Sequence, residues 1–408
     1  MRATSFSLIA LLTATSAYAD TRYKTEFGFN YSNPDATSYE ASLRGNYDPV
    51  SSVSSGARIM TDGGEGDVRF EYHINLAYSE GNAVSLLKLQ EASSTVVPST
   101  MFDLTHKSNL GSNGRLTTNL DRAWLSFTTE STVIKIGRQA ITWGQGTVFH
   151  PGDFVAPFSP NATGGGFKPG VEMVYGQYLF DSGADIQAIY VPRPETVGGD
   201  VSRDASTFAL RGSTSLGMID AALTIAEDRG DQVAALGLSG SLAGLGWKAE
   251  VVDWALASGT ADPSWLVSVM NFGSLGEWNT TYFAEYYHNG FGTTPSTSYF
   301  DLPIPLKKRM STGQVFYAGT DFLALGGSIG VSPDIGLTPS AIISLEDRSA
   351  ILGLAANVTI GDNANLSFSL FKPVGADGTE FGGRQTTSTS GIYDGASPTI
   401  SFTATQYF

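Results

Sequence analysis

The sequence predicts an all-β protein, a transmembrane antiparallel up-and-down β-barrel. Three observations predict it: apolar and polar side chains alternate with a period of two after residue 20, the alternating segments run about ten residues, and short connections alternate with long ones. Successive side chains of a strand point to opposite faces, and a tilted strand needs about 9–11 residues to cross a bilayer. Short turns at one end and long loops at the other are typical of outer-membrane barrels.

The chain begins with a predicted secretory leader, residues 1–19, followed by a single barrel domain, residues 20–408. Arg2 supplies the positive end of the leader, residues 6–14 form a short apolar core, and 17–19 read Ala-Tyr-Ala, a cleavage site with small residues. Cysteine is absent, and the formal net charge is −15. An acidic chain lacks the basic face that phosphate binding needs, so nucleic acid is not an expected partner. No cofactor is expected.

The strands follow from the alternation, taken in order along the chain. The segment "FEYHINLAY", for example, places Phe70, Tyr72 and Ile74 on one face and charged or polar residues on the other. Threading this pattern predicts about 20 strands, with 18 as the alternative count. The predicted strands are 22–32, 38–47, 51–60, 67–79, 83–92, 119–129, 132–140, 170–180, 183–192, 206–216, 218–228, 231–241, 244–255, 263–273, 277–288, 317–331, 335–345, 349–359, 364–373 and 397–408. Alternation is poorest in 38–60 and 83–92.

The connections and the charge pattern predict how the barrel sits in the cell. "SEGN", "TEST", "FDSG", "GSLGE", "VSPD" and "GDNA" are expected to be tight turns, and the long insertions are 93–118, 139–169, 193–205, 289–315 and 374–396. An even strand count places both termini in the periplasm, so we expect the outer membrane of a Gram-negative bacterium. Outer-membrane lipid and lipopolysaccharide are then partners, and "PLKKR" at 305–309 could contact lipopolysaccharide, line the pore mouth or be a solvated face.

The chain ends on "PTISFTATQYF", and this ending predicts barrel closure. Ile400, Phe402, Ala404, Gln406 and Phe408 share one face of the last strand. Pairing this strand with 22–32 would remove the open edge that lipid does not tolerate. The ending resembles the C-terminal pattern that outer-membrane barrels present to their assembly machinery, with a terminal Phe, although Gln406 stands where an apolar residue is usual.

The connection 139–169 is rich in glycine, proline and aromatic residues, which is too apolar for a loop in water. A barrel of about 20 strands has a wide lumen, so we expect this loop to fold inward and narrow it. The residues expected to form the plug or constriction are Arg138, Gln139, Trp143, His150, Asp153 and Lys168. Further residues are expected to line the lumen: Arg122, Glu172, Arg211, Lys248, Glu250 and Glu285.

Arg138 falls near the middle of a predicted strand, where an arginine facing lipid would cost about 2–4 kcal/mol. We therefore expect it to face the lumen and to pair with a carboxylate such as Asp153 or Glu172. Strict alternation would turn Lys135 and Arg138 to opposite faces, and a bulge at Gly137 could bring both inward. Arg138 is either a strut that anchors the loop or a selectivity charge.

Two stretches resemble a known family. "GRQAITWGQG" followed by "HPGDFVAPFSP", and the later stretch from Asp321 to Leu366, are similar to a porin-like superfamily of outer-membrane barrels that includes alginate-export-type barrels. The resemblance implies a pore or transport role, whereas the periodicity alone indicates only a barrel.

The expected function is therefore passage of small solutes past a loop constriction, without catalysis. The alternatives are an export conduit for polysaccharide or other cargo, and an outer-membrane enzyme with an active site at the rim. "GGSIG" at 326–330 matches a nucleophile-elbow pattern but lies inside a predicted strand, and the four histidines are dispersed. A soluble all-β protein is the remaining alternative.

Overall fold

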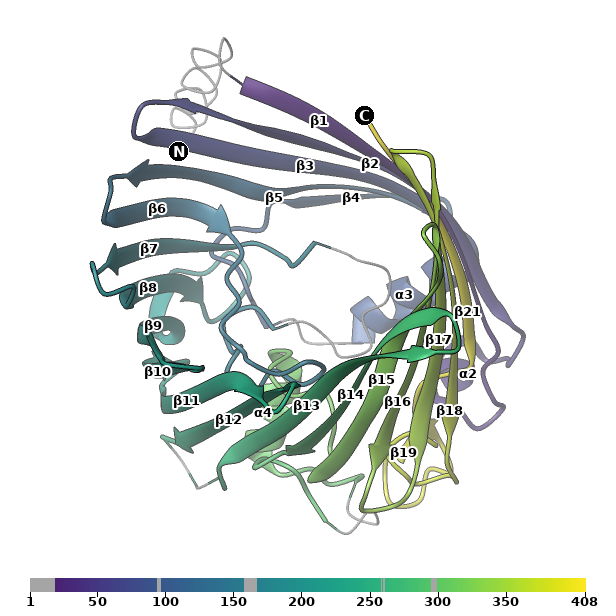
Figure 1. The fold of residues 1–408 in the computed structure, drawn as a ribbon. Coiled ribbons are helices and arrows are strands. Elements are labelled where there is room, and N and C mark those ends of the chain that lie inside the picture. The colour runs from purple at the N-terminus through teal and green to yellow at the C-terminus, as the bar shows by residue number, and fades with distance from the viewer. Residues whose placement is uncertain (1–18, 94–96, 158–166, 258, 260, 295–298) are drawn as a thin grey trace.

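The computed structural model describes residues 19–93, 97–157, 167–257, 259, 261–294 and 299–408. The predicted leader lies outside the described residues except for Ala19, which already belongs to the first strand. In the described part of the chain, the strands form one closed ring (Figure 1).

The ring has 18 antiparallel strands, which is the alternative strand count. Each strand pairs with its chain neighbours around the ring, and β1 closes it by pairing with β21, with Lys24 opposite Tyr407. In order they are β1 (Ala19–Ser32), β2 (Val50–Glu65), β3 (Val68–Glu80), β5 (Gly114–Thr128), β6 (Thr132–Gln139), β7 (Val171–Leu179), β8 (Asp185–Pro194), β9 (Val201–Leu216), β10 (Ile219–Asp228), β11 (Asp231–Leu242), β12 (Leu245–Ala255), β13 (Ser264–Leu275), β14 (Trp278–His288), β15 (Asp321–Ser332), β16 (Ile335–Ser344), β17 (Ala350–Ile360), β18 (Ala364–Val374) and β21 (Thr399–Tyr407).

Two of the predicted strands, 38–47 and 83–92, are wrong because these segments form helices. The first contains α2 (Tyr39–Arg44), which begins where the Ser38 side chain accepts a hydrogen bond from the Ala41 N–H and ends at Gly45 in a left-handed conformation. The second contains α3 (Asn82–Ser93), whose three Leu, two Ala and single Lys, Gln and Glu are all strong helix formers, and which buries Val84 and Leu86. No helix in the described residues is long and apolar enough to span a bilayer.

Further elements lie in the long connections. β4 (Thr105–Leu110) pairs with residues 114–119 of β5, next to the residues of β5 that pair with β6. α4 (Ile304–Ser311) lies in the connection between β14 and β15. β19 (Arg384–Gln385) and β20 (Tyr393–Asp394) form a small separate sheet between β18 and β21.

The tight turns predicted at "TEST", "FDSG", "GSLGE", "VSPD" and "GDNA" all join strands at the end of the ring that carries both termini. "SEGN" is wrong as a strand-to-strand turn, because it joins β3 to α3 at the opposite end. The helices and long connections lie at that opposite end.

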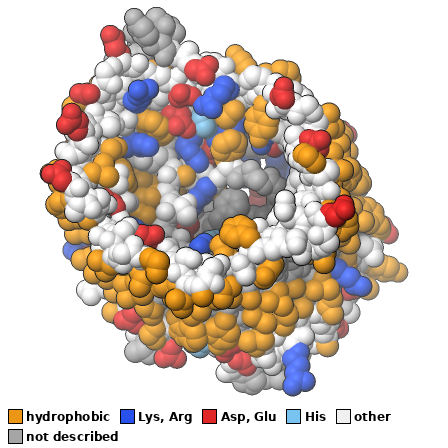
Figure 2. Space-filling model, viewed as in Figure 1, with side chains coloured by type: hydrophobic (Ala, Val, Ile, Leu, Met, Phe, Trp, Pro, Cys, Tyr) orange, Lys and Arg blue, Asp and Glu red, His pale blue; other side chains and the backbone are white. Residues whose placement is uncertain are grey.

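The outer face of the wall carries apolar side chains, whereas the inner face carries charged and polar side chains together with two apolar clusters on β7 to β17. Phe27, Leu76 and Phe368 are 49%, 46% and 46% exposed, although all lie in the middle of strands. Figure 2 shows apolar side chains around the outside of the ring and charged side chains around the central hollow. The apolar outer face predicted for Phe27, Leu76 and Phe368 is confirmed, although the lumen is not uniformly polar, because apolar clusters form where the connection between β6 and β7 packs against the wall.

Candidate functional site

The candidate site is the interior of the ring, where the connection between β6 and β7 leaves the wall and crosses the lumen (Figure 1). We call its described residues, 140–157 and 167–170, the inward loop. Trp143, Phe154 and Val155 pack against inward side chains of β7 to β12, and Phe149 reaches a second group on β13 to β17. Phe149 stacks on Tyr287 of β14 with ring centroids 4.6 Å apart. The inward loop therefore reaches from one side of the lumen to the other.

Glu285 of β14 holds the tip of the inward loop. Its side chain is fully buried, with 0% exposure, and its two oxygens accept three backbone N–H groups. The distances are 2.6 Å from Thr147, 3.0 Å from Val148 and 2.7 Å from Phe149. A carboxylate that accepts several backbone donors satisfies groups that would otherwise be buried without partners. The loop tip is thus tied to the wall through its main chain.

Glu250 of β12 holds the middle of the loop in a similar way. It accepts hydrogen bonds from the backbone N–H groups of Gln145, at 3.4 Å, and Gly152. A Cβ atom at Gly152 would overlap Glu250 Oε1, so only glycine allows this close approach of backbone to carboxylate.

Two wall arginines complement these carboxylates by binding backbone carbonyl groups of the loop. Arg193 of β8 donates to the Val155 oxygen at 2.9 Å, and Arg211 of β9 donates to the Trp143 oxygen at 3.1 Å. The Trp143 indole N–H donates to Gln187 Oε1 at 2.9 Å. Wall side chains of both signs therefore bind the loop, mostly through its main-chain atoms.

Asp153, Lys168 and His150 form the ionisable centre of the inward loop. Lys168 Nζ donates to Asp153 Oδ2 and to the Ile141 carbonyl oxygen, which joins the outgoing and returning parts of the loop. Burial raises the pKa of Asp153 to about 6, although Lys168 opposes this shift. Burial, aided by the charges of Lys168 and Lys248, lowers the pKa of His150 to about 4.

These two shifts predict opposite pH effects on loop docking. The raised pKa of Asp153 stabilises the docked loop fully at pH values below 3.8, the ordinary pKa of this group. This stabilisation is lost as the pH rises through about 6. The lowered pKa of His150 stabilises the docked loop fully at pH values above 6.5, the ordinary pKa of this group. This stabilisation is lost as the pH falls through about 4. Between about pH 4 and 6 the two contributions oppose each other, so we expect little pH dependence in the natural protein.

Single substitutions should expose the two contributions. We expect Asp153→Asn to undock more readily as the pH falls from 6 to 4, and His150→Gln to undock more readily as the pH rises over that range. The frequency of large current fluctuations in a planar bilayer measures undocking. Slopes of the same sign in both variants would contradict the assignment.

Arg138 lies at the end of β6 and does not contact the outgoing part of the inward loop. It pairs with Glu172 of β7, and Arg138 Nε lies 2.8 Å from Glu172 Oε1. Glu172 is one of the two carboxylates predicted as its partner.

The strand register runs through Gly137 without a shift, so the proposed bulge there is wrong. Lys135 and Arg138 therefore lie on opposite faces, and Arg138 shares the outer face with the exposed Ile134 and Ile136 instead of facing the lumen as expected. The bulge lies instead on β5, opposite His73 and Ile74, where Asp121 is the extra residue.

Arg138 and Glu172 bind residues 97–104, which we call the rim strap. The strap runs across the ends of the strands at the long-loop side, and buried side chains hold its main chain. Four side chains bind the strap along its length. Arg229, at the β10–β11 turn, donates to the Pro98 oxygen, and Arg193 donates to the Ser99 oxygen. Glu172 accepts from the Met101 N–H, and Arg138 donates to the Phe102 oxygen. Arg138 is therefore a strut for the rim strap, and its role in selectivity stays a prediction.

The remaining predicted residues take different positions. Arg122 donates to the Lys168 carbonyl oxygen and so holds the returning part of the loop, while Gln139 donates to backbone oxygens within β6 and β7. Lys248 is half-buried on the inner wall and has no ion pair among the described residues.

A buried charge cluster beneath α4 was not predicted from the sequence. Arg309, at 1% exposure, pairs with Asp228 at 3.3 Å and with Asp231, and its guanidinium lies 3.9 Å from the ring centre of Trp254. Gln314 links this cluster to the inward loop by donating to the Phe154 oxygen at 2.8 Å. The sequence features of this cluster are the basic stretch 305–309 and the neighbouring Asp228 and Asp231. Both features are typical of solvated segments, so they did not indicate burial.

Within the described residues, no group of three or more histidine or acidic side chains is placed to hold a metal ion. No family model and no curated protein matches the sequence. The family resemblance therefore stays a prediction.

Solved structures do match the fold. OccAB1 of Acinetobacter baumannii superposes with a TM-score of 0.54 at 10% identity, covering 96% of each chain, and OccAB3 gives 0.54 at 9% identity, covering 96% of this chain and 99% of that one. Wzi of Escherichia coli, an outer-membrane carbohydrate-binding β-barrel involved in group 1 capsule assembly, gives 0.51 at 9% identity over 98% of this chain and 86% of its own. The fold is that of an outer-membrane β-barrel. At such low identity, the likeness concerns the fold alone.

Proposed function

We propose that this protein is an outer-membrane channel through which small solutes pass, and that the inward loop forms its constriction. The observation that carries the proposal is the attachment of the loop across the lumen by Glu250 and Glu285. Both carboxylates lie on strands, and both accept backbone N–H groups of the loop. A loop held in this way narrows a wide lumen to a defined passage without closing the barrel wall.

The polarity of the wall supports a location in the outer membrane. The apolar outer surface faces lipid, the short turns and both termini lie in the periplasm, and the helices and long connections face the medium and lipopolysaccharide. The segment offered to the assembly machinery is β21 with the terminal Phe408, and both pair with β1. The resemblance of residues 135–170 to alginate-export-type barrels supports a transport role as well.

Planar-bilayer recording of the refolded mature chain tests the proposal. We expect discrete conductance steps, and we expect larger steps after deletion of residues 143–167, because the deletion removes most of the constriction. Deletion of residues 387–391, in the connection between β18 and β21, is the matched control and should leave the steps unchanged. Absence of conductance in both the natural chain and the 143–167 deletion, with folding shown by heat-modifiable migration, would refute the channel.

A further inference from the structure

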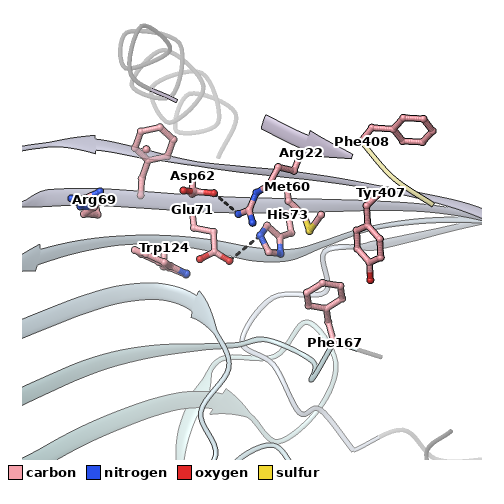
Figure 3. Close-up of a pocket in the computed structure, with 12 residues that line it drawn as sticks. Arg22, Met60, Asp62, Arg69, Glu71, His73, Trp124, Phe167, Tyr407 and Phe408 are labelled. Carbon is pink, nitrogen blue, oxygen red and sulfur yellow. Dashed lines mark hydrogen bonds and ion pairs between the residues drawn. The ribbon is translucent and has the colours of Figure 1, made fainter. Parts of the chain in front are cut away.

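A cavity of about 440 Å³ lies inside the barrel, at the end that carries the termini and the short turns (Figure 3). Its walls come from β1, β2, β3, β5 and β21, and Phe167 of the inward loop projects into it. It is separate from the side of the lumen on which residues 143–157 pack. A cavity of this volume lies within the range of about 300–1,000 Å³ that small-ligand sites occupy.

Apolar and aromatic side chains make up half of the residues that line this cavity, namely Met60, Phe70, Trp124, Phe167, Tyr407 and Phe408. Trp124 of β5 is half-buried, whereas Phe167 and Tyr407 are 41% and 44% exposed. Tyr407 faces inward because it is opposite Lys24, which is buried on the inner wall. Aromatic rings left accessible in a concave site are suited to contact with an apolar ligand face.

Cations already occupy positions above the rings of Trp124, Phe167 and Tyr407. Lys24 Nζ lies 5.9 Å from the ring centre of Tyr407. Lys135 Nζ lies 4.0 Å from the ring centre of Trp124, and Arg58 Cζ lies 3.7 Å from that of Phe167. A second cation near the same ring would be repelled by the first, so the rings do not form a cage for a cationic ligand.

The polar groups of the cavity are arranged in compensated pairs. Arg22 donates to Asp62 at 2.6 Å, and His73 Nε2 lies 2.9 Å from Glu71 Oε1. Each carboxylate keeps further acceptor positions, and Arg22 keeps further N–H donors. Arg69 also lines the cavity, so two arginines balance the two carboxylates and the lining has no net charge. The cavity therefore offers fixed donors and acceptors and favours neither an anionic nor a cationic ligand.

We propose that this cavity is a binding subsite for a neutral saccharide. A pyranose ring has apolar C–H faces, which fit the aromatic surfaces, and hydroxyl groups at its edge, which fit the paired donors and acceptors. The cavity accommodates one or two such rings. This inference rests on the proposed channel function and adds the substrate class and a stopping point on the periplasmic side of the constriction.

Calorimetric titration of the folded mature chain in detergent with maltose tests the subsite. We expect saturable binding that weakens by about tenfold in Trp124→Leu and in Phe167→Leu, since each loses an aromatic contact. Trp247→Leu is the matched control, because Trp247 lines a different cavity of about 460 Å³, and its binding should be unchanged. Heat-modifiable migration shows whether each variant is folded.

Glucuronate, glucosamine and uridine serve as anionic, cationic and planar-ring probes. Tighter binding of any of these than of maltose would overturn the saccharide assignment, as would maltose binding that neither variant weakens. Conductance recorded on the same preparations separates the two proposals. Conductance without maltose binding refutes only the subsite, whereas maltose binding without conductance refutes only the channel.

Discussion

Replacing Glu285 with alanine is expected to release the tip of the inward loop and to enlarge the single-channel conductance severalfold. The three backbone N–H groups of Thr147, Val148 and Phe149 lose their acceptor in this variant. Each buried donor left without a partner costs about 1–3 kcal/mol, so the docked tip becomes unfavourable relative to a hydrated loop. The barrel itself should persist, because the strand pairings around Glu285 do not involve its side chain.

Asp220→Ala is the matched control for this prediction. Asp220 is also an inward carboxylate, on β10, but its hydrogen bond comes from Ser215 and it has no contact with the described part of the inward loop. Its removal should leave the step size close to that of the natural protein. Equal step sizes in Glu285→Ala and the natural chain would show that the loop tip does not limit the current.

Replacing Arg309 with methionine is expected to detach α4 and its flanking segments from the barrel rim. The substitution leaves Asp228 and Asp231, at 0% and 3% exposure, without this guanidinium partner. Breaking a buried ion pair from one side costs about 3–5 kcal/mol because a charge stays buried. The segment 299–320 should then become sensitive to thermolysin, whereas the barrel strands stay resistant.

Lys307→Met tests whether the effect is specific to the buried pair. Lys307 is on the same helix, but its side chain is 54% exposed and its ion pair with Asp301 spans 3.5 Å. Exposed pairs of this kind contribute little, so this variant should be cleaved at the natural rate. Equal cleavage of both variants would mean that the cluster beneath α4 does not hold the segment.

The fold was predictable where each side chain had one clear side. The alternation in β3 and β18 assigns every residue to lipid or to the lumen, and this assignment places the strands. The two wrong strands failed for a local reason, since Ser38 and Gly45 are helix capping residues and 83–92 is rich in helix-forming residues. Alternation was poor in both segments, so the pattern carried little information there.

The candidate site was predictable only in part. Rings and glycines in residues 139–169 indicated a loop that packs inside the barrel, and inward positions on strands indicated Arg211, Glu250 and Glu285. The contacts of Arg138 could not be predicted, because it binds the rim strap. The strap lies in a connection without regular alternation, so the sequence does not indicate where it runs. Arg309 was not predictable as a buried residue, because burial of a basic cluster depends on aspartates about 80 positions away in the chain.

The rim strap is bound almost entirely through its own peptide groups, by Arg138, Glu172, Arg193 and Arg229. Hydrogen bonds to peptide groups do not depend on the side chains of the strap, as long as these four anchoring residues are retained. The side chains of residues 97–104 can therefore vary in sequence while this end of the barrel keeps its shape.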